Sequence, residues 1–257
     1  MTRDKLEPSR RNFLYRALQG AGVIFFSGCD KLYEIESFQA VLRAAEDANR
    51  TVQRLLTPKN KLAQEFSEKD ISPVFRPNGN PAPKTPEYLA DAANHWRAWR
   101  LEVKGLVARP SEFSLADLKS MRSRTQITRH DCVEGWSVIG KWKGVPLARI
   151  IETVQPRTEV KYVVFRCLDT NSSGIHYYES ISLEDAMHPQ TILAYELNDK
   201  PVPIANGAPL RLRVENQLGY KHAKYIKSLE FVASFASIEK GKGGYWEDRG
   251  YEWYAGI

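Results

Sequence analysis

The sequence predicts an α+β fold, in which short helices lie among the strands of mixed β-sheets. Two observations predict it. From Trp99 onward, most of the chain consists of short runs rich in β-branched and aromatic residues, separated by turn residues. The helical patterns between those runs are short. Short helices segregated among many strands are typical of this fold class.

The composition allows a sizeable core and argues against nucleic-acid binding. The chain has 257 residues, 42% hydrophobic and 26% charged, which is enough for one large domain with extensions or for two small ones. Its formal net charge is +6. Residues 1–28 hold five basic and two acidic residues, so they contribute +3 and leave only +3 for the remainder. No basic stripe with interleaved aromatic residues occurs, so we expect no nucleic-acid partner.

Residues 1–28 are predicted to be a signal peptide. Arg10 and Arg11 precede a short apolar run, 21–26, far below the ~20 residues that span a bilayer. Paired arginines indicate the twin-arginine route, which exports folded proteins to the periplasm. The letters FSGC, ending at Cys29, resemble a bacterial lipoprotein box, so cleavage would leave Cys29 as a lipidated first residue. An uncleaved N-terminal anchor or a buried amphipathic helix is the alternative.

Residues 29–74 are predicted to form an N-terminal helix and a linker. Apolar residues recur with a helical period over residues 35–56, opposite a polar face. This helix either packs on the domain or holds it off a membrane. Thr57 and Pro58 are predicted to end it. The proline-rich stretch 72–88 then predicts an extended path in which helix is disfavoured.

The remaining elements are predicted in chain order from local patterns. Ser114 is expected to cap a helix with Asp117 at its third position, and a turn is expected at Asn198 and Asp199. The predicted strands are 99–107, 160–168, 191–203 (interrupted by that turn), 208–216 and 223–234. The predicted helices are 114–121, 145–154 (entered by a proline) and a short one at the start of 182–189.

The cysteines leave several interpretations open. With Cys29 assigned to the N-terminus, Cys132 and Cys167 remain. In an oxidising compartment a disulfide between them is one hypothesis. No CxxC or CxxCH occurs, so neither a zinc ribbon nor covalent c-type haem is indicated. Cys132 follows charged and polar residues and precedes a turn-like stretch, 133–137, and a buried free cysteine is always an alternative for such a residue.

Three ordered motifs carry a family resemblance. They are CVEGWSVIGKWKGVPL from Cys132, AYELNDKPVPIANGAPLRL over 194–212, and GYKHAKYIKSLEFV over 219–232. Together they resemble the sulfite-oxidase-type molybdopterin domain, and within it the bacterial catalytic subunit that repairs methionine sulfoxide in periplasmic proteins. The resemblance implies a sulfite-oxidase-like fold, an oxidoreductase domain over 75–240 and an aromatic tail over 241–257.

The resemblance implies a molybdenum-molybdopterin cofactor. In this family the metal has one pterin dithiolene, oxo groups and a single protein thiolate, and soft sulfur suits such a centre. Cys132 matches the position of that thiolate, which binds in its deprotonated form. Cofactor contacts are also implied at Asn78, Cys167, Asn206, Arg211, His222, Ala223 and Lys224. Gly79 departs from the pattern, because sulfite oxidases carry histidine there, and this departure weakens the expectation of any role for that segment beyond backbone contact.

Substrate groups are also implied by the resemblance. Ser137 stands where sulfite oxidases carry an anion-binding arginine, which puts sulfite in doubt as the substrate. Arg129 and His130 are candidate replacements. Tyr251 matches a tyrosine that lines the pocket mouth in sulfite oxidases, with Trp246, Arg249 and Trp253 as further candidates in the tail. The alternative is that these aromatic residues only pack on the sheet.

We therefore expect an enzyme that transfers an oxygen atom to or from a small S- or N-oxide or a sulfoxide, free or protein-bound. No nucleotide fingerprint or haem pattern occurs, so a membrane haem protein or a soluble cytochrome is expected to exchange its electrons. The family's long dimerisation domain has no counterpart, so a monomer is expected. A sulfite-oxidising enzyme, a non-catalytic lipoprotein binding module and a disulfide-stabilised binding module are the alternatives.

Overall fold

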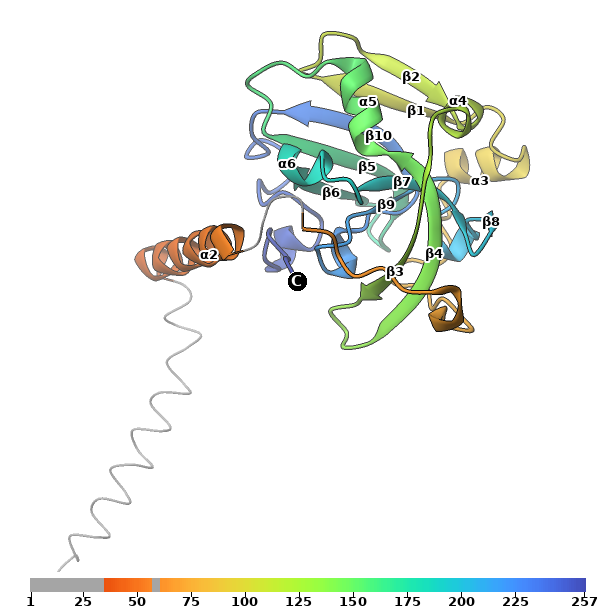
Figure 1. The fold of residues 1–257 in the computed structure, drawn as a ribbon. Coiled ribbons are helices and arrows are strands. Elements are labelled where there is room, and N and C mark those ends of the chain that lie inside the picture. The colour runs from red at the N-terminus through yellow and green to blue at the C-terminus, as the bar shows by residue number, and fades with distance from the viewer. Residues whose placement is uncertain (1–34, 57–60) are drawn as a thin grey trace, which may run out of the picture. The chain divides into compact units, whose positions relative to one another are not determined.

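The computed structural model describes residues 35–56 and 61–257, which form two units (Figure 1). The predicted signal peptide, Cys29 and the predicted helix end at Thr57 and Pro58 lie outside the described residues. The first unit contains α2 (Glu36–Leu56), which confirms the helix predicted over 35–56. Within the described residues, no helix combines the length and apolar character that crossing a membrane requires.

The second unit contains two five-stranded sheets. The first is built from β1 (Arg100–Gly105), β2 (Ser111–Ser114), β5 (Tyr162–Thr170), β6 (His176–Ser182) and β10 (Ile226–Val232). Their order is β2-β1-β10-β5-β6. Because β1 pairs with β10 in parallel while the other pairs are antiparallel, the sheet is mixed, and the predicted α+β class is confirmed.

The second sheet is antiparallel and carries the first motif. Its strands are β3 (Arg124–Asp131), β4 (Ser137–Pro146), β7 (Ile192–Leu197), β8 (Lys200–Pro201) and β9 (Arg211–Arg213). They follow the order β3-β4-β7-β8, and β9 also pairs with β7. The β3–β4 hairpin turns through residues 132–136, so the stretch predicted to be turn-like does link two strands.

Short helices fill the connections. They are η1 (Glu68–Asp70), α3 (Pro86–Ala93), α4 (Leu115–Ser120), α5 (Leu147–Val154), α6 (Leu183–Ala186), η2 (Ile204–Asn206), η3 (Gly219–Lys221) and η4 (Glu247–Arg249). The predicted cap of α4 is confirmed, because Ser114 Oγ accepts a hydrogen bond from the Asp117 N–H at 3.1 Å. The apolar face of α5 is buried in the main core with the inner residues of the first sheet.

Several boundaries differ from the predictions. The extended path predicted over 72–88 was wrong for its last three residues, because Pro86 occupies the first turn of α3, where a missing N–H costs nothing. The strand predicted over 208–216 is only β9, three residues long. Pro209 has no N–H to donate to a ladder there. The turn at Asn198 and Asp199 is confirmed, with φ of +51° and +61°.

Candidate functional site

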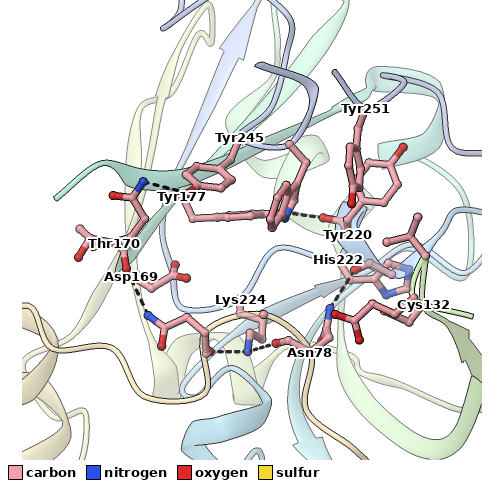
Figure 2. A pocket seen from close by; sticks show the side chains of 17 residues that line it. Asn78, Cys132, Asp169, Thr170, Tyr177, Tyr220, His222, Lys224, Tyr245 and Tyr251 are labelled. Atoms are coloured by element: carbon pink, nitrogen blue, oxygen red, sulfur yellow. Dashed lines mark hydrogen bonds between the residues drawn. The ribbon is translucent and has the colours of Figure 1, made fainter. Parts of the chain in front are cut away.

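A cavity of about 320 Å³ lies in the second unit (Figure 2). Segments far apart in the sequence line it: the loop 78–80, the hairpin turn at Cys132, the end of β5, η3 and the C-terminal tail. Figure 2 shows Tyr245 and Tyr251 on one side, Lys224 and Asn78 on the opposite side, and Cys132 near His222 at one end. Six sequence-predicted site residues therefore meet in one place: Asn78, Cys132, His222, Lys224, Trp246 and Tyr251.

Cys132 is held at this end of the cavity by the hairpin turn. Its N–H donates to the Trp136 carbonyl and its carbonyl accepts from the Gly135 N–H, both at 2.9 Å. Gly135 has φ +86°, a conformation that glycine adopts without strain. The side chain is 9% exposed and the thiol is free. Burial raises the pKa of the Cys132 thiol, so a nearby cation is needed to hold it as a thiolate.

The polar floor of the cavity, defined as Asn78, Asp169, His222 and Lys224, carries three buried atoms without a partner in the described part of the chain. They are Asn78 Oδ1, Asp169 Oδ1 and His222 Nδ1. His222 Nε2 lies 3.1 Å from the Gln217 carbonyl, so Nε2 carries the hydrogen and the neutral ring leaves Nδ1 as an acceptor. Burial lowers the pKa of His222 well below its usual value, which keeps the ring neutral.

All three unpartnered atoms of the polar floor are thus acceptors. An unsatisfied buried polar atom costs roughly 1–3 kcal/mol, so a site that leaves three of them is built for a ligand that donates hydrogen bonds. A reduced pterin has ring N–H and amino donors and therefore fits these acceptors. Burial raises the pKa of Asp169 to about 6, an effect that Lys224 partly offsets.

Lys224 and Arg211 supply positive charge to this side of the cavity. Lys224 Nζ donates to the carbonyls of Asn78, Asn80 and Ala205 at 2.6, 2.7 and 3.1 Å. Burial, and then the Arg211 charge, lower the pKa of Lys224 to about 7. A phosphate near this ammonium would hold it protonated, because an opposite charge favours the charged form.

Arg211 is fully buried but does not line the cavity. One of its nitrogens donates to the Asn206 carbonyl at 2.8 Å, while Nε and Nη2 have no hydrogen-bond partner in the part of the chain that the structure describes. Asn206 in turn donates to the Phe75 carbonyl at 3.2 Å. A side chain at Gly207 would meet both Arg211 Cβ and Lys224 Cβ at 3.1 Å, so this glycine lets the two cations approach each other. The pair is suited to an anion such as the phosphate of the pterin.

His130 and Arg129 lie outside the cavity lining. His130 is buried and its ring centroid is 5.0 Å from that of His222. Its Nδ1 accepts from Arg213 at 3.0 Å, so Nε2 carries the hydrogen, and no partner for it lies among residues 35–56 and 61–257. Arg129 is exposed on the opposite face of β3 and pairs with Asp131 at 2.9 Å. The strand alternation therefore places His130 behind the cavity and Arg129 in solvent.

Cys167 and Ala223 are buried in the main core rather than in the cavity lining. Cys167 is a free thiol on β5, and its carbonyl contacts His176 Nδ1 at 3.1 Å. Burial raises the pKa of Cys167 well above its usual value. The disulfide hypothesis is not supported, because both described cysteines are free.

The aromatic wall of the cavity is defined as Tyr177, Tyr220, Tyr245, Trp246 and Tyr251. Trp246 and Tyr251 stack at 5.3 Å and 26°, and Tyr177 and Tyr245 stack at 5.3 Å and 29°. A hydrogen bond also fixes one ring of the wall, since the Tyr220 hydroxyl donates to the Glu252 carbonyl at 2.7 Å. Of the other tail candidates, Arg249 lies over the ring of Tyr245 and Trp253 packs against Tyr162 and Phe235, and neither is part of the cavity lining.

Sequence reasoning missed several lining residues, namely Asp169, Thr170, Asn171, Tyr177, Tyr220 and Glu134. Glu134 and Tyr220 lie inside motifs that were identified, so their position next to Cys132 and His222 was a usable signal. Asp169 to Asn171 follow a strand that was predicted, and polar residues at the end of a buried strand are a general sign of a site. No motif in the sequence points to Tyr177, which lies on the unpredicted strand β6.

Comparison with known proteins places the chain among molybdopterin proteins. Residues 88–237 match the family described as oxidoreductase molybdopterin binding domain. A protein of Azospira oryzae, provisionally named protein-methionine-sulfoxide reductase subunit YedZ1, is 38% identical over 97% of this chain and 88% of its own length. The protein-methionine-sulfoxide reductase catalytic subunit MsrP of Campylobacter jejuni is 29% identical, over 90% of this chain and 76% of its own length.

Two further matches cover less of the chain. MsrP of Xanthomonas axonopodis pv. citri is 39% identical over 52% of this chain and 45% of its own length. Among solved structures, the sulfane dehydrogenase SoxCD from Paracoccus pantotrophus matches 53% of this chain and 38% of that chain, with 21% identity and a TM-score of 0.48.

Proposed function

The chain belongs to the oxidoreductase molybdopterin-binding domain family, and from this premise we propose that it reduces sulfoxides, with methionine sulfoxide in proteins as its substrate class. The family match confirms the resemblance and the fold that three sequence motifs predicted, and it makes the protein a molybdopterin-dependent oxidoreductase. The choice of sulfoxide is supported by relatives named as protein-methionine-sulfoxide reductases that align with most of this chain.

One observation carries the proposal: the cavity places a lone thiol beside a floor of unpartnered acceptors. Cys132 is the protein ligand in this proposal, and Asn78, Asp169 and His222 accept hydrogen bonds from the pterin. Lys224 lies next to them and Arg211 behind it, as the positive charges for the phosphate. Among the described residues, no three His, Cys, Asp or Glu side chains gather to hold a metal, and the family's cofactor asks for a single protein thiolate.

When bound, the molybdenum-pterin supplies the two-electron oxygen-atom transfer, and the protein binds, orients and excludes water. The aromatic wall stands across the cavity from the polar floor (Figure 2). Aromatic rings pack against the methyl and methylene groups of an oxidised methionine and form favourable contacts with the thioether sulfur of its reduced product, so this wall suits such a side chain. Ser137 is exposed and bonds Asp131 at 2.5 Å outside the cavity lining, and this offers no anion contact for sulfite.

Electrons come from a separate redox protein in this proposal, either a membrane haem protein or a soluble cytochrome. The paired arginines of residues 1–28 support export to the periplasm in the folded state, since a buried cofactor must be inserted first. The FSGC letters support lipid anchoring through Cys29. These features lie outside the described residues and are supported by the sequence alone.

The test is purification from a host that makes the pterin, followed by elemental analysis and assays. We expect molybdenum and pterin in a one-to-one ratio with the protein, and reduction of methionine sulfoxide in a peptide by a chemically reduced dye. Sulfite oxidation is expected to be absent or much slower. A folded protein free of molybdenum would contradict the cofactor assignment, while a metal-loaded protein that oxidises sulfite and leaves sulfoxides unchanged would contradict the substrate class.

A further inference from the structure

A fully buried cluster of three charged residues lies next to the aromatic wall, and the proposed chemistry does not use it. The Lys221 ammonium donates to Glu179 Oε1 and to Glu247 Oε1, both at 2.5 Å. The side chains of all three residues are 0–1% exposed. We call these three residues the charged hub. Burying charges costs several kcal/mol per ion, so such a cluster persists only where its geometry is well satisfied.

Each member of the charged hub comes from a different part of the fold. Glu179 is on β6, Lys221 is the last residue of η3, and Glu247 begins η4 in the tail. The neighbours of these three residues line the cavity: Tyr177 on β6, Tyr220 and His222 around η3, and Tyr245, Trp246 and Tyr251 around η4. The hub is therefore the point where the elements that carry the aromatic wall are joined.

Other contacts fit the tail closely around the hub. The Tyr245 N–H donates to the Tyr178 carbonyl at 2.9 Å, and the Tyr178 hydroxyl donates to Asp248 at 2.7 Å. A Cβ at Gly244 would lie 2.0 Å from Glu247 Oε2 and 2.8 Å from Glu179 Oε1. No side chain can therefore be placed at residue 244 unless the hub moves.

The hub contains two carboxyl groups and one ammonium. Burial, and then the Glu247 charge, raise the pKa of Glu179 well above its usual value. Glu179 Oε2 and Glu247 Oε2 have no hydrogen-bond partner in the described residues. A proton on Glu179 leaves the hub electrically neutral, which is what a dry site requires.

We propose that Glu179, Lys221 and Glu247 are positioning residues, which fix the aromatic wall over the cavity and thereby set the affinity for the sulfoxide substrate rather than for the cofactor. The part of this proposal that concerns substrate affinity rests on the proposed function. The wall belongs to the tail, β6 and η3, whereas Cys132 and Asn78 belong to the hairpin and to the loop after η1. His222 of the polar floor directly follows Lys221, so the tail member of the hub, Glu247, is the one farthest in sequence from the floor. Loss of Glu247 should therefore loosen the wall and leave the metal in place.

The decisive variants are made at Glu247, the tail member of the hub. In Glu247→Ala, Lys221 loses one of its two carboxylate partners and the tail loses its link to the hub. We expect KM for a methionine-sulfoxide peptide to rise by about tenfold or more, with kcat changed by less than about threefold, because misplaced contacts weaken binding first. In Glu247→Gln, the amide accepts from Lys221 and donates to Glu179, so KM is expected to stay within about twofold of the wild-type value. Glu239→Ala, which removes an exposed carboxylate from the same region, is the matched control.

Hydrogen–deuterium exchange of the metal-loaded proteins tests the positioning without any substrate. Amides of residues 243–254 are expected to exchange at least about tenfold faster in Glu247→Ala, but not in Glu247→Gln or Glu239→Ala. Unchanged exchange in Glu247→Ala would contradict the positioning role of the hub. Faster exchange with an unchanged KM, or a parallel loss of molybdenum, would overturn its assignment to substrate affinity. A wild-type protein inactive on every sulfoxide would remove the proposed substrate, and the exchange result alone would then decide whether the hub positions the wall.

Discussion

The two sides of the cavity differ in how complete they are. The polar floor leaves three buried acceptors without a partner among the described residues, and Arg211 behind it has two unbonded nitrogens. The aromatic wall is packed ring on ring, and the charged hub joins the elements that carry it. A site that lacks hydrogen bonds is completed by a resident ligand, while a prepacked wall suits a ligand that comes and goes. We infer that the floor holds the cofactor and the wall meets the substrate.

The same contrast appears on β9, between two arginines two residues apart. Both are fully buried and both lie 4.9 Å from the ring of Trp142. Arg213 is paired with Glu215 and bonded to His130. Among the described residues, the Asn206 carbonyl is the hydrogen-bond acceptor of Arg211, and burial, then the charge of Arg213, lower its pKa to about 9. We therefore assign Arg213 to the fold and Arg211 to an anion of the bound cofactor.

The largest expected effect is at Cys132, which tests whether the floor holds a metal. Loss of a residue that merely supports a metal ligand costs about 10–100-fold, so Cys132→Ser is expected to lower sulfoxide reduction by more than about a hundredfold. The Mo(V) resonance should change or disappear, because a hydroxyl cannot replace a soft thiolate. Cys167→Ala is the matched control, because it removes the other described thiol, which lies in the main core, and the Mo(V) resonance should persist in this variant. Full activity in Cys132→Ser would show that Cys132 does not bind the metal, and the cofactor could then not be assigned to the floor side of the cavity.

The two arginines of β9 give the next largest effect. Arg213→Met is expected to lower the free energy of unfolding of cofactor-free protein by about 3–5 kcal/mol, because it leaves Glu215 buried without its cation. Arg211→Met should change that free energy by less than about 1 kcal/mol, since no buried charge loses a partner. Chemical denaturation of both variants measures the difference.

The Arg211→Met protein is further expected to retain less pterin when it is purified from a host that makes it. If Arg211→Met were as destabilising as Arg213→Met and kept its cofactor, the assignment of Arg211 to an anion would be wrong.

Lys224 gives an effect of intermediate size that depends on pH. Burial and Arg211 lower its pKa to about 7, from an unfolded value near 10.5. Between these pH values the unfolded chain binds more protons than the folded one, so this residue makes cofactor-free protein more stable as pH rises from 7 to 10, by about 2–4 kcal/mol. That contribution should vanish in Lys224→Met, so the difference between the two unfolding curves isolates it. A rise that persists unchanged in the variant would show that Lys224 is not a charge forced into a dry floor.

The smallest effect is expected at Tyr251, on the wall side. Tyr251→Phe keeps the stack on Trp246, so KM is expected to stay within about twofold, whereas Tyr251→Ala should raise KM about three- to tenfold, since an aromatic pair is worth about 0.5–1.5 kcal/mol. Steady-state kinetics on a methionine-sulfoxide peptide separate the two variants. A kcat more than about tenfold lower in Tyr251→Phe would give the hydroxyl a catalytic role, and the wall would then be more than a packing surface.

Local patterns in the sequence determined much of this protein, because their causes are local. The cap at Ser114, the turn at Asn198 and Asp199, and the strands β1, β5 and β10 were all predictable from residues close in the chain. The three motifs also carried the family and the thiol at Cys132, since residue type and spacing are enough to recognise them. Strand β6 was missed, although its two tyrosines and its isoleucine are compatible with a strand.

Only the tertiary structure decided which predicted residues share the cavity and which do not. Arg129 and His130 are neighbours in the sequence, yet the pleat of β3 sends one into solvent and the other behind the cavity. Glu179, Lys221 and Glu247 are 26 to 68 residues apart, so no local pattern could indicate that they meet. Which buried charge is paired and which lacks a partner depends on distances across the fold, and pairing decides whether that charge serves the core or a ligand.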